Sequence, residues 1–395
     1  MKHNGRIQTW LEIFLVSTKL GLTSFGGPVA HLGYFHQEYV RRRKWMDEKS
    51  YADLVALCQF LPGPASSQVG IGIGVMRGGV MGGIISFLGF TLPSVIALIL
   101  FVLFLQTTGV EETSWLNGLK IVAVAVVAHA VIGMGKNFAP DLKTKLITLL
   151  TLVFVLLWQT QYSQLIAIVL AGIIGLFLFR QISDDHETTT HFPISRRFGT
   201  ICLTLFFGLL VAFPILRNMT SIEWIALFDS FYRAGALVFG GGHVVLPLLE
   251  KEFVPTGWLT EQQFLAGYGA TQAVPGPLFT FAAYIGAIIN GWQGGLFATI
   301  AIFLPAILLI LGTLPFWDVL RKNNLIKSAL IGINASVVGI LFAALYDPIW
   351  TSSIHSASDF ALAAILFTML VYFKLPPWIV VMTGLFGWII FSNLL

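Results

Sequence analysis

Gln59-Phe60-Leu61-Pro62-Gly63-Pro64 interrupts a long apolar run, and Gln272-Ala273-Val274-Pro275-Gly276-Pro277 interrupts another run 213 positions later. Proline ends a helix because it lacks the backbone N–H and its ring clashes with the preceding turn, whereas proline at a first helical position favours a new helix. Pro-Gly-Pro therefore predicts a helix end, a free glycine and a helix start. Within a bilayer, irregular backbone is tolerated only where protein buries it or it lines a polar cavity. We therefore expect a site at this break.

The composition places these breaks in a membrane. Of 395 residues, 56% are hydrophobic and 11% are charged, and the mean hydropathy is +0.83. A soluble domain of this length would expose large apolar patches. Apolar stretches of roughly 18 or more residues, long enough to span a bilayer as helices, recur along the chain. We predict an all-α polytopic membrane protein.

Charge and cysteine content exclude several other classes. The net charge of +4 comes from basic residues that flank the apolar runs, which indicates cytoplasmic loops and not a nucleic-acid partner. Cys58 and Cys202 lie in apolar runs without a CxxC pattern or a histidine cluster, so neither a disulfide framework nor a metal site is expected. The charged start of the chain carries no cleavable signal pattern. No cofactor motif is present, and we expect no cofactor.

The first half is predicted to contain two broken pairs of half-helices followed by full spans. The first pair covers residues 6–25 and 28–39, and the second covers 49–61 and 64–76. Arms of about 12 or 13 residues reach roughly 18–20 Å, which is short of the roughly 30 Å of hydrocarbon. The remaining predicted segments are full spans at 80–106, 116–135, 144–158 and 163–180, a hydrophilic linker at 183–197 and a connecting span at 198–216.

The opening pattern returns in the second half of the chain. At an offset of 214, Lys19 matches Arg233, Phe25-Gly26-Gly27 matches Phe239-Gly240-Gly241, and Glu38 matches Glu252. At an offset of 213 the two Pro-Gly-Pro breaks coincide, and at 212 Gly82-Gly83 matches Gly294-Gly295 and Pro93 matches Pro305. Such self-similarity indicates an internal repeat. We assign an N-terminal transporter repeat to 1–181, the linker and a connecting transmembrane helix to 182–217, and a C-terminal repeat to 218–395.

Loop charges predict how the copies face. If each broken pair returns to its own side, the N-terminus, the basic run 41–44 and Arg77 share one side, opposite Glu111 and Glu112. The equivalent loops of the two copies, basic at 41–49 and acidic at 250–261, then fall on opposite sides. The positive-inside rule places the N-terminus in the cytoplasm, with Arg217 as an exception. The copies are thus predicted to be inverted repeats whose half-helices meet near the bilayer midplane, as in many secondary transporters.

Half-helix starts are suited to binding an anion. A helix N-terminus offers free N–H groups and about half an elementary positive charge, and four half-helices restart near Pro28, Pro64, His243 and Pro277. Hydroxyls and amides in their first turns suit a tetrahedral oxyanion, and the glycines allow close backbone approach or, alternatively, helix packing. The residues predicted to line the site are Gly26, Gly27, Pro28, Gln59, Pro62, Gly63, Pro64, Ser66, Ser67, Gln68, Gly240, Gly241, Gly242, His243, Gln272, Pro275, Gly276, Pro277 and Thr280.

Two cations complete the predicted site. Lys19 and Arg233 each lie in an apolar helix, six residues before a Phe-Gly-Gly. Intramembrane cations are costly and usually face a cavity or a partner, so we expect them to act as countercharges for a dianion. The alternative is that they snorkel, or that Lys19 pairs with Glu12 and Arg233 with Asp229. Similarly, Gln59 and Gln272 either orient the ligand or satisfy carbonyls freed by the prolines.

The breaks together resemble the signature of the chromate ion transporter family, in its long-chain, two-domain form. The likeness rests on Phe25-Gly26-Gly27-Pro28, Pro62-Gly63-Pro64 with Ser66-Ser67-Gln68, Phe239-Gly240-Gly241-Gly242-His243 and Pro275-Gly276-Pro277, and it covers nearly the whole chain. The resemblance implies multi-pass chromate export across the bacterial cytoplasmic membrane, with sulfate as a competitor or exchange ion. Gly242-His243 stands where the first copy has Pro28-Val29, so the roles of the halves are left open.

Two other functions are compatible with the residues. Dipole-lined re-entrant helices also build anion channels. A membrane-bound chromate reductase would need a flavin, a haem or a thiol pair. The partners expected for the transporter are chromate, sulfate and the lipid bilayer; the coupling ion, the preferred oxyanion and the oligomeric state, with a homodimer as one alternative, are left open.

Overall fold

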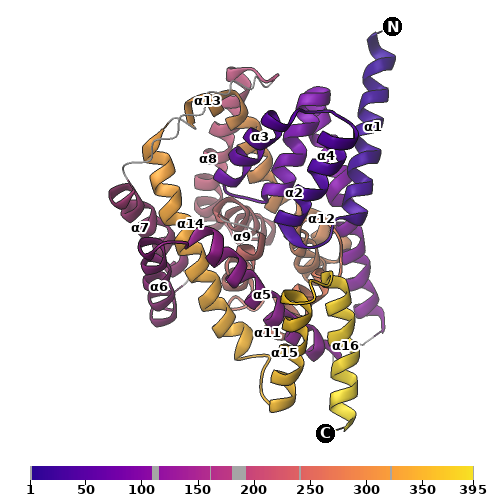
Figure 1. Cartoon of the computed structure of the whole chain (residues 1–395), viewed down its shortest axis with the longest axis vertical. Helices are drawn as coiled ribbons and strands as arrows, with labels where there is room; N and C mark the ends of the chain where they lie inside the picture. The colour runs from indigo at the N-terminus through magenta and orange to yellow at the C-terminus, as the bar shows by residue number, and fades with distance from the viewer. Residues whose placement is uncertain are drawn as a thin grey trace.

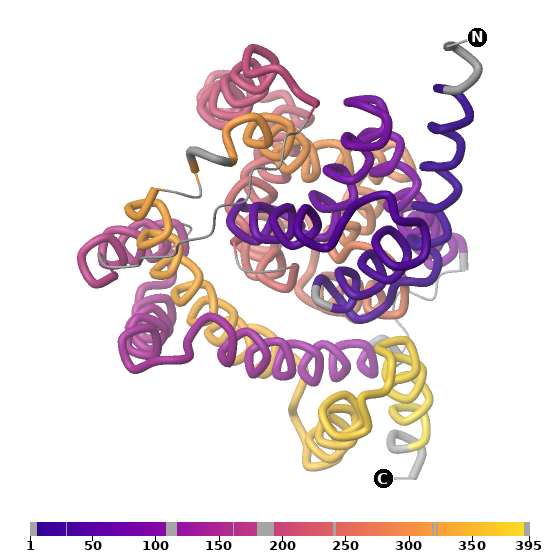
Figure 2. Tube along the Cα trace, turned by 45° about the horizontal axis from the view of Figure 1, so that its top comes forward, coloured from indigo at the N-terminus to yellow at the C-terminus, as the bar shows by residue number. Residues whose placement is uncertain are grey.

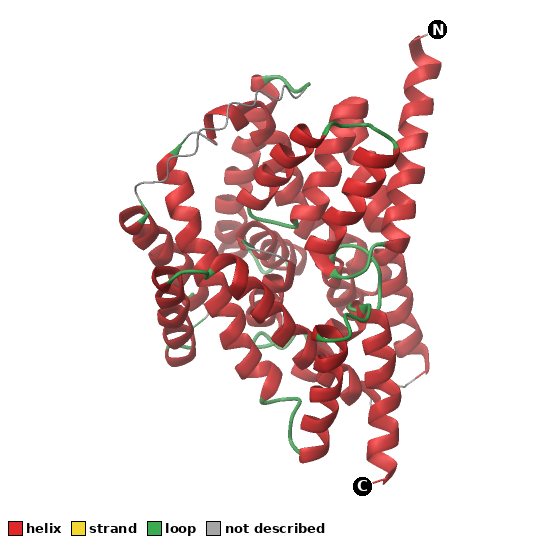
Figure 3. Ribbon diagram, in the orientation of Figure 1, coloured by secondary structure: helices red, strands yellow, loops and turns green. Residues whose placement is uncertain are grey.

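In a computed structural model the chain folds into a bundle of helices, without a strand among the residues described (Figure 3). These are residues 2–108, 115–160, 162–179, 193–239, 242–320 and 323–394. Within them, 5 helical stretches are long and apolar enough to cross a bilayer, judged by length and composition. Helix α1 begins at one end of the bundle and α16 ends at the other (Figure 1). The predicted all-α membrane fold is confirmed.

The first repeat opens with a broken helix. Its elements are α1 (Lys2–Thr23), α2 (Gly27–Phe35), the π-helix η1 (His36–Arg42), α3 (Glu48–Phe60) and α4 (Ala65–Thr108). Between α1 and α2 the chain reverses through Gly26 and Gly27, whose φ angles are 96° and 79°. Only glycine adopts this left-handed region without strain. The first break therefore lies at 24–26, slightly before the predicted 26–28.

Helix α4 is a hairpin of two helical arms. Gly78 (φ −136°, ψ 17°) and Gly79 (φ 68°, ψ −167°) leave the helical region between a short arm and a long arm. The arms touch at glycine, because a Cβ at Gly74 would collide with the Gly82 carbonyl oxygen and the reverse also holds. The short arm is the predicted half-helix 64–76, and the long arm is the predicted span 80–106.

The second repeat reproduces this pattern. Its elements are α9 (Glu223–Leu237), the 3₁₀ turn η3 (Gly242–Val244), α10 (Val245–Phe253), α11 (Glu261–Thr271), η4 (Leu278–Thr280) and α12 (Phe281–Thr313). Helix α12 turns back at Asn290 and Gly291, which leave the helical region at the positions equivalent to Gly78 and Gly79. Gly286 and Gly294 form the same glycine contact between the arms.

Contacts between the long arms show that the repeats are inverted. The rings of Phe87 and Phe303 lie 5.1 Å apart, and further along a Cβ at Gly295 would meet Ile99. Residue numbers rise along α4 as they fall along α12, so equivalent arms run antiparallel. Within the repeats, α1 runs parallel to the long arm of α4, because Trp10 contacts Gly78 and Gly21 contacts Phe90. Helix α9 likewise runs parallel to the long arm of α12, because Trp224 contacts Phe297 and Gly235 contacts Ile302. Helices α1 and α9 therefore run in opposite directions.

The remaining helices interlock the repeats. They are α5 (Trp115–Phe138), α6 (Leu142–Leu157), α7 (Ser163–Leu178), α8 (Arg196–Met219), the 3₁₀ turn η5 (Leu314–Phe316), α13 (Trp317–Leu320), α14 (Asn324–Ala344), the π-helix η6 (Leu345–Trp350), α15 (Ala357–Val371) and α16 (Pro377–Leu394). The hairpin α6–α7 packs on α14, whereas α15–α16 packs on α5. Both views show these hairpins at opposite flanks (Figures 1 and 2). Each repeat thus places its last hairpin on the long helix of the other.

The predicted spans agree with the helices, but part of the topology argument lies outside the described residues. Segments 116–135, 144–158, 163–180 and 198–216 correspond to α5, α6, α7 and α8. Glu111, Glu112 and linker residues 183–192 are not among the described residues. The basic run and Arg77 do share one end of the bundle, because Glu12 pairs with both Arg43 and Arg77. The domain boundaries remain a prediction.

Replacing Gly294 by alanine should destabilise the protein, because the added Cβ would collide with the Gly286 carbonyl oxygen of the facing arm. Overpacking of this kind costs about 1–3 kcal/mol, so the thermal unfolding midpoint of the purified protein should fall. Gly208→Ala in α8 is the matched control, since nothing lies within 4 Å of a Cβ there. Equal midpoints for the two variants would contradict the tight hairpin contact.

Candidate functional site

The four helix breaks meet through two crossed backbone hydrogen bonds. Gly63 N–H in the first Pro-Gly-Pro donates to the Val238 carbonyl at the end of α9, at 2.6 Å. Gly276 N–H in the second Pro-Gly-Pro donates to the Ser24 carbonyl at the end of α1, at 2.9 Å. Each bond joins one repeat to the other, and the two bonds occupy equivalent positions. We call residues 24–28, 62–64, 238–239, 242–243 and 275–277 the junction.

Further contacts bring the remaining half-helix starts into the junction. A Cβ at Gly27 would lie 3.7 Å from Nε2 of His243, and a Cβ at Gly242 would lie 3.3 Å from Leu278 and 3.6 Å from Pro28. His243 Nδ1 and the Tyr268 hydroxyl are 2.7 Å apart. The starts of α2, η3–α10 and η4–α12 therefore adjoin one another. Gly240 and Gly241, also predicted here, lie outside the described residues.

The two Pro-Gly-Pro turns are built alike but satisfied differently. Gly63 and Gly276 have φ angles of 115° and 106°, where glycine is needed. Nε2 of Gln68 donates to the Pro62 carbonyl at 2.9 Å, and the Thr280 hydroxyl donates to the Pro277 carbonyl at 2.7 Å. Gln68 thus satisfies the carbonyl freed by the prolines, a role that the sequence analysis had suggested for Gln59. Gln59 is exposed, whereas its counterpart Gln272 is 7% exposed.

The first-repeat residues after Pro-Gly-Pro are buried and polar. Ser66, Ser67 and Gln68 are at most 2% exposed. The Ser66 hydroxyl lies 3.3 Å from Nδ1 of His31. Their second-repeat equivalents, at the offset of 213, are Phe279, Thr280 and Phe281. The predicted polar first turn is therefore a property mainly of the first repeat.

Lys19 lies in a cluster of charges on the N-terminal side of the junction. Its Nζ is 3.9 Å from Glu38 Oε2, and its side chain is 54% exposed. Glu38 also accepts hydrogen bonds from Arg42 and Arg43. Glu12, the partner suggested by the sequence, pairs with Arg43 and Arg77 instead.

Arg233 lies in the equivalent cluster of the second repeat. It pairs with Asp229 at 2.8 Å, as the sequence alternative proposed, and with Glu252 at 3.0 Å. Lys19–Glu38 and Arg233–Glu252 are thus equivalent ion pairs at the offset of 214. Arg217 joins this cluster at 3.1 Å from Asp229 and 3.5 Å from Glu252. These partners give a physical reason why Arg217 is tolerated against the positive-inside rule.

Sequence reasoning missed four buried polar groups, of which Ser24 belongs to the junction and the other three lie in the helices beside it. Within the described part of the chain, side-chain atoms of these residues have no hydrogen-bond partner: Ser24 Oγ, His31 Nε2, Thr91 Oγ1 and Ser94 Oγ. Each residue is at most 1% exposed. Ser67 Oγ, Gln68 Oε1 and Gln272 Nε2 also lack a hydrogen-bond partner within the described chain. Buried polar atoms are normally paired with protein, water or an ion, so this concentration makes the junction our candidate binding site.

The signal for these residues was present in the sequence. Ser24 directly precedes Phe-Gly-Gly, and Thr91 and Ser94 flank Pro93, which the repeat comparison had already matched to Pro305. In an apolar run, however, single hydroxyls are also common as helix-packing groups. Only the three-dimensional contacts distinguish a hydroxyl that binds a ligand from one that packs helices.

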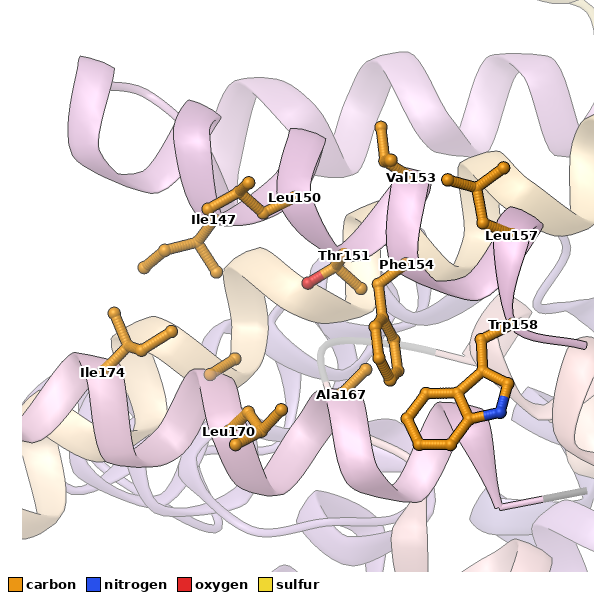
Figure 4. Close-up of a pocket in the computed structure, with 11 residues that line it drawn as sticks. Ile147, Leu150, Thr151, Val153, Phe154, Leu157, Trp158, Ala167, Leu170 and Ile174 are labelled. Atoms are coloured by element: carbon orange, nitrogen blue, oxygen red, sulfur yellow. The ribbon is translucent and has the colours of Figure 1, made fainter. Parts of the chain in front are cut away.

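Two cavities away from the junction are poorly suited to an oxyanion. The groove in Figure 4, of about 470 Å³, lies between α6 and α7 and is lined by apolar side chains apart from Thr151 Oγ1 and the Trp158 indole nitrogen. A second cavity, of about 410 Å³, lies beside α10 and is more polar. Its charged lining consists of two carboxylates, Glu250 and Asp347, and one cation, Lys251. The first suits an acyl chain, and the charge of the second disfavours a dianion.

Comparison with known proteins identifies the chain's relatives. The family model for chromate transporters matches residues 11–176 and 225–388, one match in each repeat. A chromate transport protein of Pseudomonas aeruginosa is 26% identical over 97% of this chain and 92% of its own length. A probable chromate transport protein of Synechococcus elongatus is 30% identical over 95% and 94%. An uncharacterised transporter of Methanocaldococcus jannaschii is 29% identical over 84% and 83%. No solved structure matches the chain.

Replacing Gly276 by alanine should damage the junction. The left-handed φ strains alanine by about 1–2 kcal/mol, and the Cβ would also collide with the Ser94 hydroxyl. Gly257→Ala is the matched control, because Gly257 has a φ of 77° but nothing lies within 4 Å of a Cβ there. The thermal unfolding midpoint should fall further for Gly276→Ala, and equal midpoints would argue against close packing at the junction.

Proposed function

Since the chain belongs to the chromate transporter family, we propose that it is a secondary active transporter that exports chromate across the bacterial cytoplasmic membrane. The observation that supports this proposal most directly is the junction, where half-helix starts of both repeats meet around unpartnered buried polar groups. Inverted repeats with broken helices at their interface are the common architecture of secondary transporters. The proposed role is transport and not catalysis.

The anion is held between the repeats at the half-helix starts. Each start contributes backbone N–H groups and part of a helix dipole, and Ser66, Ser67 and Gln68 add side-chain polar groups. A tetrahedral dianion has four oxygens that accept hydrogen bonds from several directions. Sulfate has the same shape and charge, so it competes with chromate or exchanges for it. Rocking of one repeat against the other then exposes the anion to each face in turn.

Lys19 and Arg233 act along the path on either side of the junction. Because α1 and α9 run in opposite directions and both cations lie near the end of their helix, one cation lies toward each face. In the structure each is balanced by carboxylates. In our proposal these ion pairs separate when their side of the protein opens. The cation is then no longer neutralised by a carboxylate, and it attracts the dianion.

The charge clusters also support a direction. On the N-terminal side, four cations (Lys19, Arg42, Arg43 and Arg77) face two carboxylates (Glu12 and Glu38), a net charge of about +2. On the other side, Arg217 and Arg233 balance Asp229 and Glu252. The positive-inside rule makes the N-terminal side cytoplasmic. A dianion is therefore attracted more strongly to the cytoplasmic entrance, which favours capture from the cytoplasm, and in our proposal the gradient of the coupling ion drives net export.

Purified protein in proteoliposomes should move chromate at a saturable rate that sulfate on the same side reduces. Varying sulfate and pH on each side then identifies the exchange or coupling ion. Ion conductance far above transporter turnover would show a channel instead. Reduction of chromate by the protein would show the reductase, and absence of any chromate flux would refute the proposed function.

Alanine at Lys19 or at Arg233 should abolish chromate export from cells in which the variant still reaches the membrane. Lys145→Ala is the control, because Lys145 is an exposed cation at the start of α6. The exchange Lys19→Glu with Glu38→Lys retains an ion pair but moves the positive charge. We expect this double variant to recover thermal stability but not export. Normal export by both alanine variants would remove these charges from the mechanism.

A further inference from the structure

We propose that the oxyanion binds off the centre of the junction, in a niche of neutral donors from the first repeat around Gly276. The niche is formed by Ser24, His31, Thr91 and Ser94, and we call it the hydroxyl niche. This inference rests on the proposed function and deepens it, because it assigns the binding contacts to one of two equivalent positions. None of these four residues carries a formal countercharge in the structure.

The contacts show that the niche is continuous. Ser94 Oγ lies against Gly276, close enough to collide with a Cβ there, and the Phe90 carbonyl would lie 3.6 Å from that Cβ. The Gly276 N–H bonds to the Ser24 carbonyl. The His31 ring packs edge-on against Phe90, with centroids 5.5 Å apart. Thr91 is three residues before Ser94 and shares its helix face. Residues from α1, α2 and α4 thus form a connected set of contacts with the second Pro-Gly-Pro turn.

At the equivalent place around Gly63 the counterparts of the niche residues are apolar, and Gln68 Nε2, which would lie 3.2 Å from a Cβ at Gly63, already donates to the Pro62 carbonyl. There Gly63 N–H bonds to Val238, the counterpart of Ser24, and a Cβ at Gly63 would lie 3.1 Å from Ala306, the counterpart of Ser94. Phe303 is the counterpart of Thr91, and its ring lies 5.8 Å from that of Phe279, the counterpart of Ser66. Val245 replaces His31. The backbone at the two places is alike, so the side chains alone decide which one takes an anion.

The free hydrogen-bonding atoms of the niche match an oxyanion. Ser24 Oγ, Thr91 Oγ1, Ser94 Oγ and His31 Nε2 are buried and lack a partner within the described chain. His31 Nδ1 already faces the Ser66 hydroxyl, and the imidazole also contacts the Ser24 backbone, so in the proposal Nε2 donates to the anion when it carries the proton. The second Pro-Gly-Pro turn leads directly into η4 and α12, so the dipole of that helix adds positive potential. Hydrogen bonds to an ionised acceptor are stronger than neutral ones, so neutral donors suffice for a desolvated dianion.

Lys19 pairs with Glu38 and is 54% exposed, in contrast to the buried niche residues. The cation therefore guides the anion along its path, whereas the hydroxyls hold it. If the hydroxyls and not Lys19 hold the anion, a prediction follows that a countercharge role of Lys19 alone would not give. Removing a hydroxyl should change affinity and leave the ligand-free fold intact.

The test compares Thr91→Val and Ser94→Ala with the matched control Thr299→Val. Like Thr91, Thr299 is a buried threonine within a long helix, here α12, but its hydroxyl donates to the Gly295 carbonyl of its own helix. Sulfate and chromate binding to detergent-purified protein is measured by calorimetry, and chromate KM is measured in proteoliposomes. We expect roughly tenfold or greater loss of affinity, with a similar rise in KM, for the two niche variants. The control should bind as the parent protein does.

Thermal unfolding without anion distinguishes a ligand-binding role from a structural one. Removal of a hydroxyl that lacks a partner should leave the midpoint unchanged or raise it, whereas removal of a structural hydrogen bond lowers it. Chromate flux with parental KM and affinity in both variants would overturn the niche and leave the proposed function standing. Anion binding that the variants lose, without any chromate flux by the parent, would support the niche and refute transport. A parent protein that binds neither anion overturns the niche.

Discussion

The structure depends on the only backbone donor in each Pro-Gly-Pro. Prolines have no N–H, so the glycine N–H is the single donor of each triplet. In hydrocarbon that donor and the carbonyls freed at the ends of α1 and α9 must all find partners. The structure satisfies both needs at once: each glycine bonds to the freed carbonyl of the opposite repeat, Gly63 to Val238 and Gly276 to Ser24. Neither repeat can complete its own break, and this requirement draws the four breaks together.

The same bonds explain why a symmetric backbone supports an asymmetric site. They use only backbone atoms, so they leave the surrounding side chains free to differ between the repeats. Around Gly276 the chain places Ser24 and Ser94, whereas around Gly63 it places Val238 and Ala306, with the Gln68 amide already bonded to the Pro62 carbonyl. The first set offers hydrogen bonds, and the second supplies packing. One half of the junction can thus serve as scaffold while the other binds.

Much of the architecture followed from the sequence because it depends on rare landmarks. Proline, glycine and charged residues are scarce in apolar runs, so their recurrence at offsets of 212 to 214 predicted the repeat, and loop charges predicted its inversion. The pairing of charges followed less easily. Glu38 had been matched to Glu252, but a sequence gives no distance between Lys19 and Glu38. These residues lie on opposite sides of a break and meet because η1, after α2, packs against α1.

The hydroxyl niche could not be predicted for a related reason. Thr91 and Ser94 lie within a span that reads as continuous helix, and their meaning depends on Gly276, which is 182 residues from Ser94 in the chain. That distance has a mechanistic consequence. The niche combines α4 of one repeat with the Pro-Gly-Pro turn of the other, so any rocking of the repeats that shifts α4 against that turn also changes the donors around the anion. In the proposed mechanism, opening one side therefore weakens binding at the moment the anion is exposed, which couples release to the conformational change.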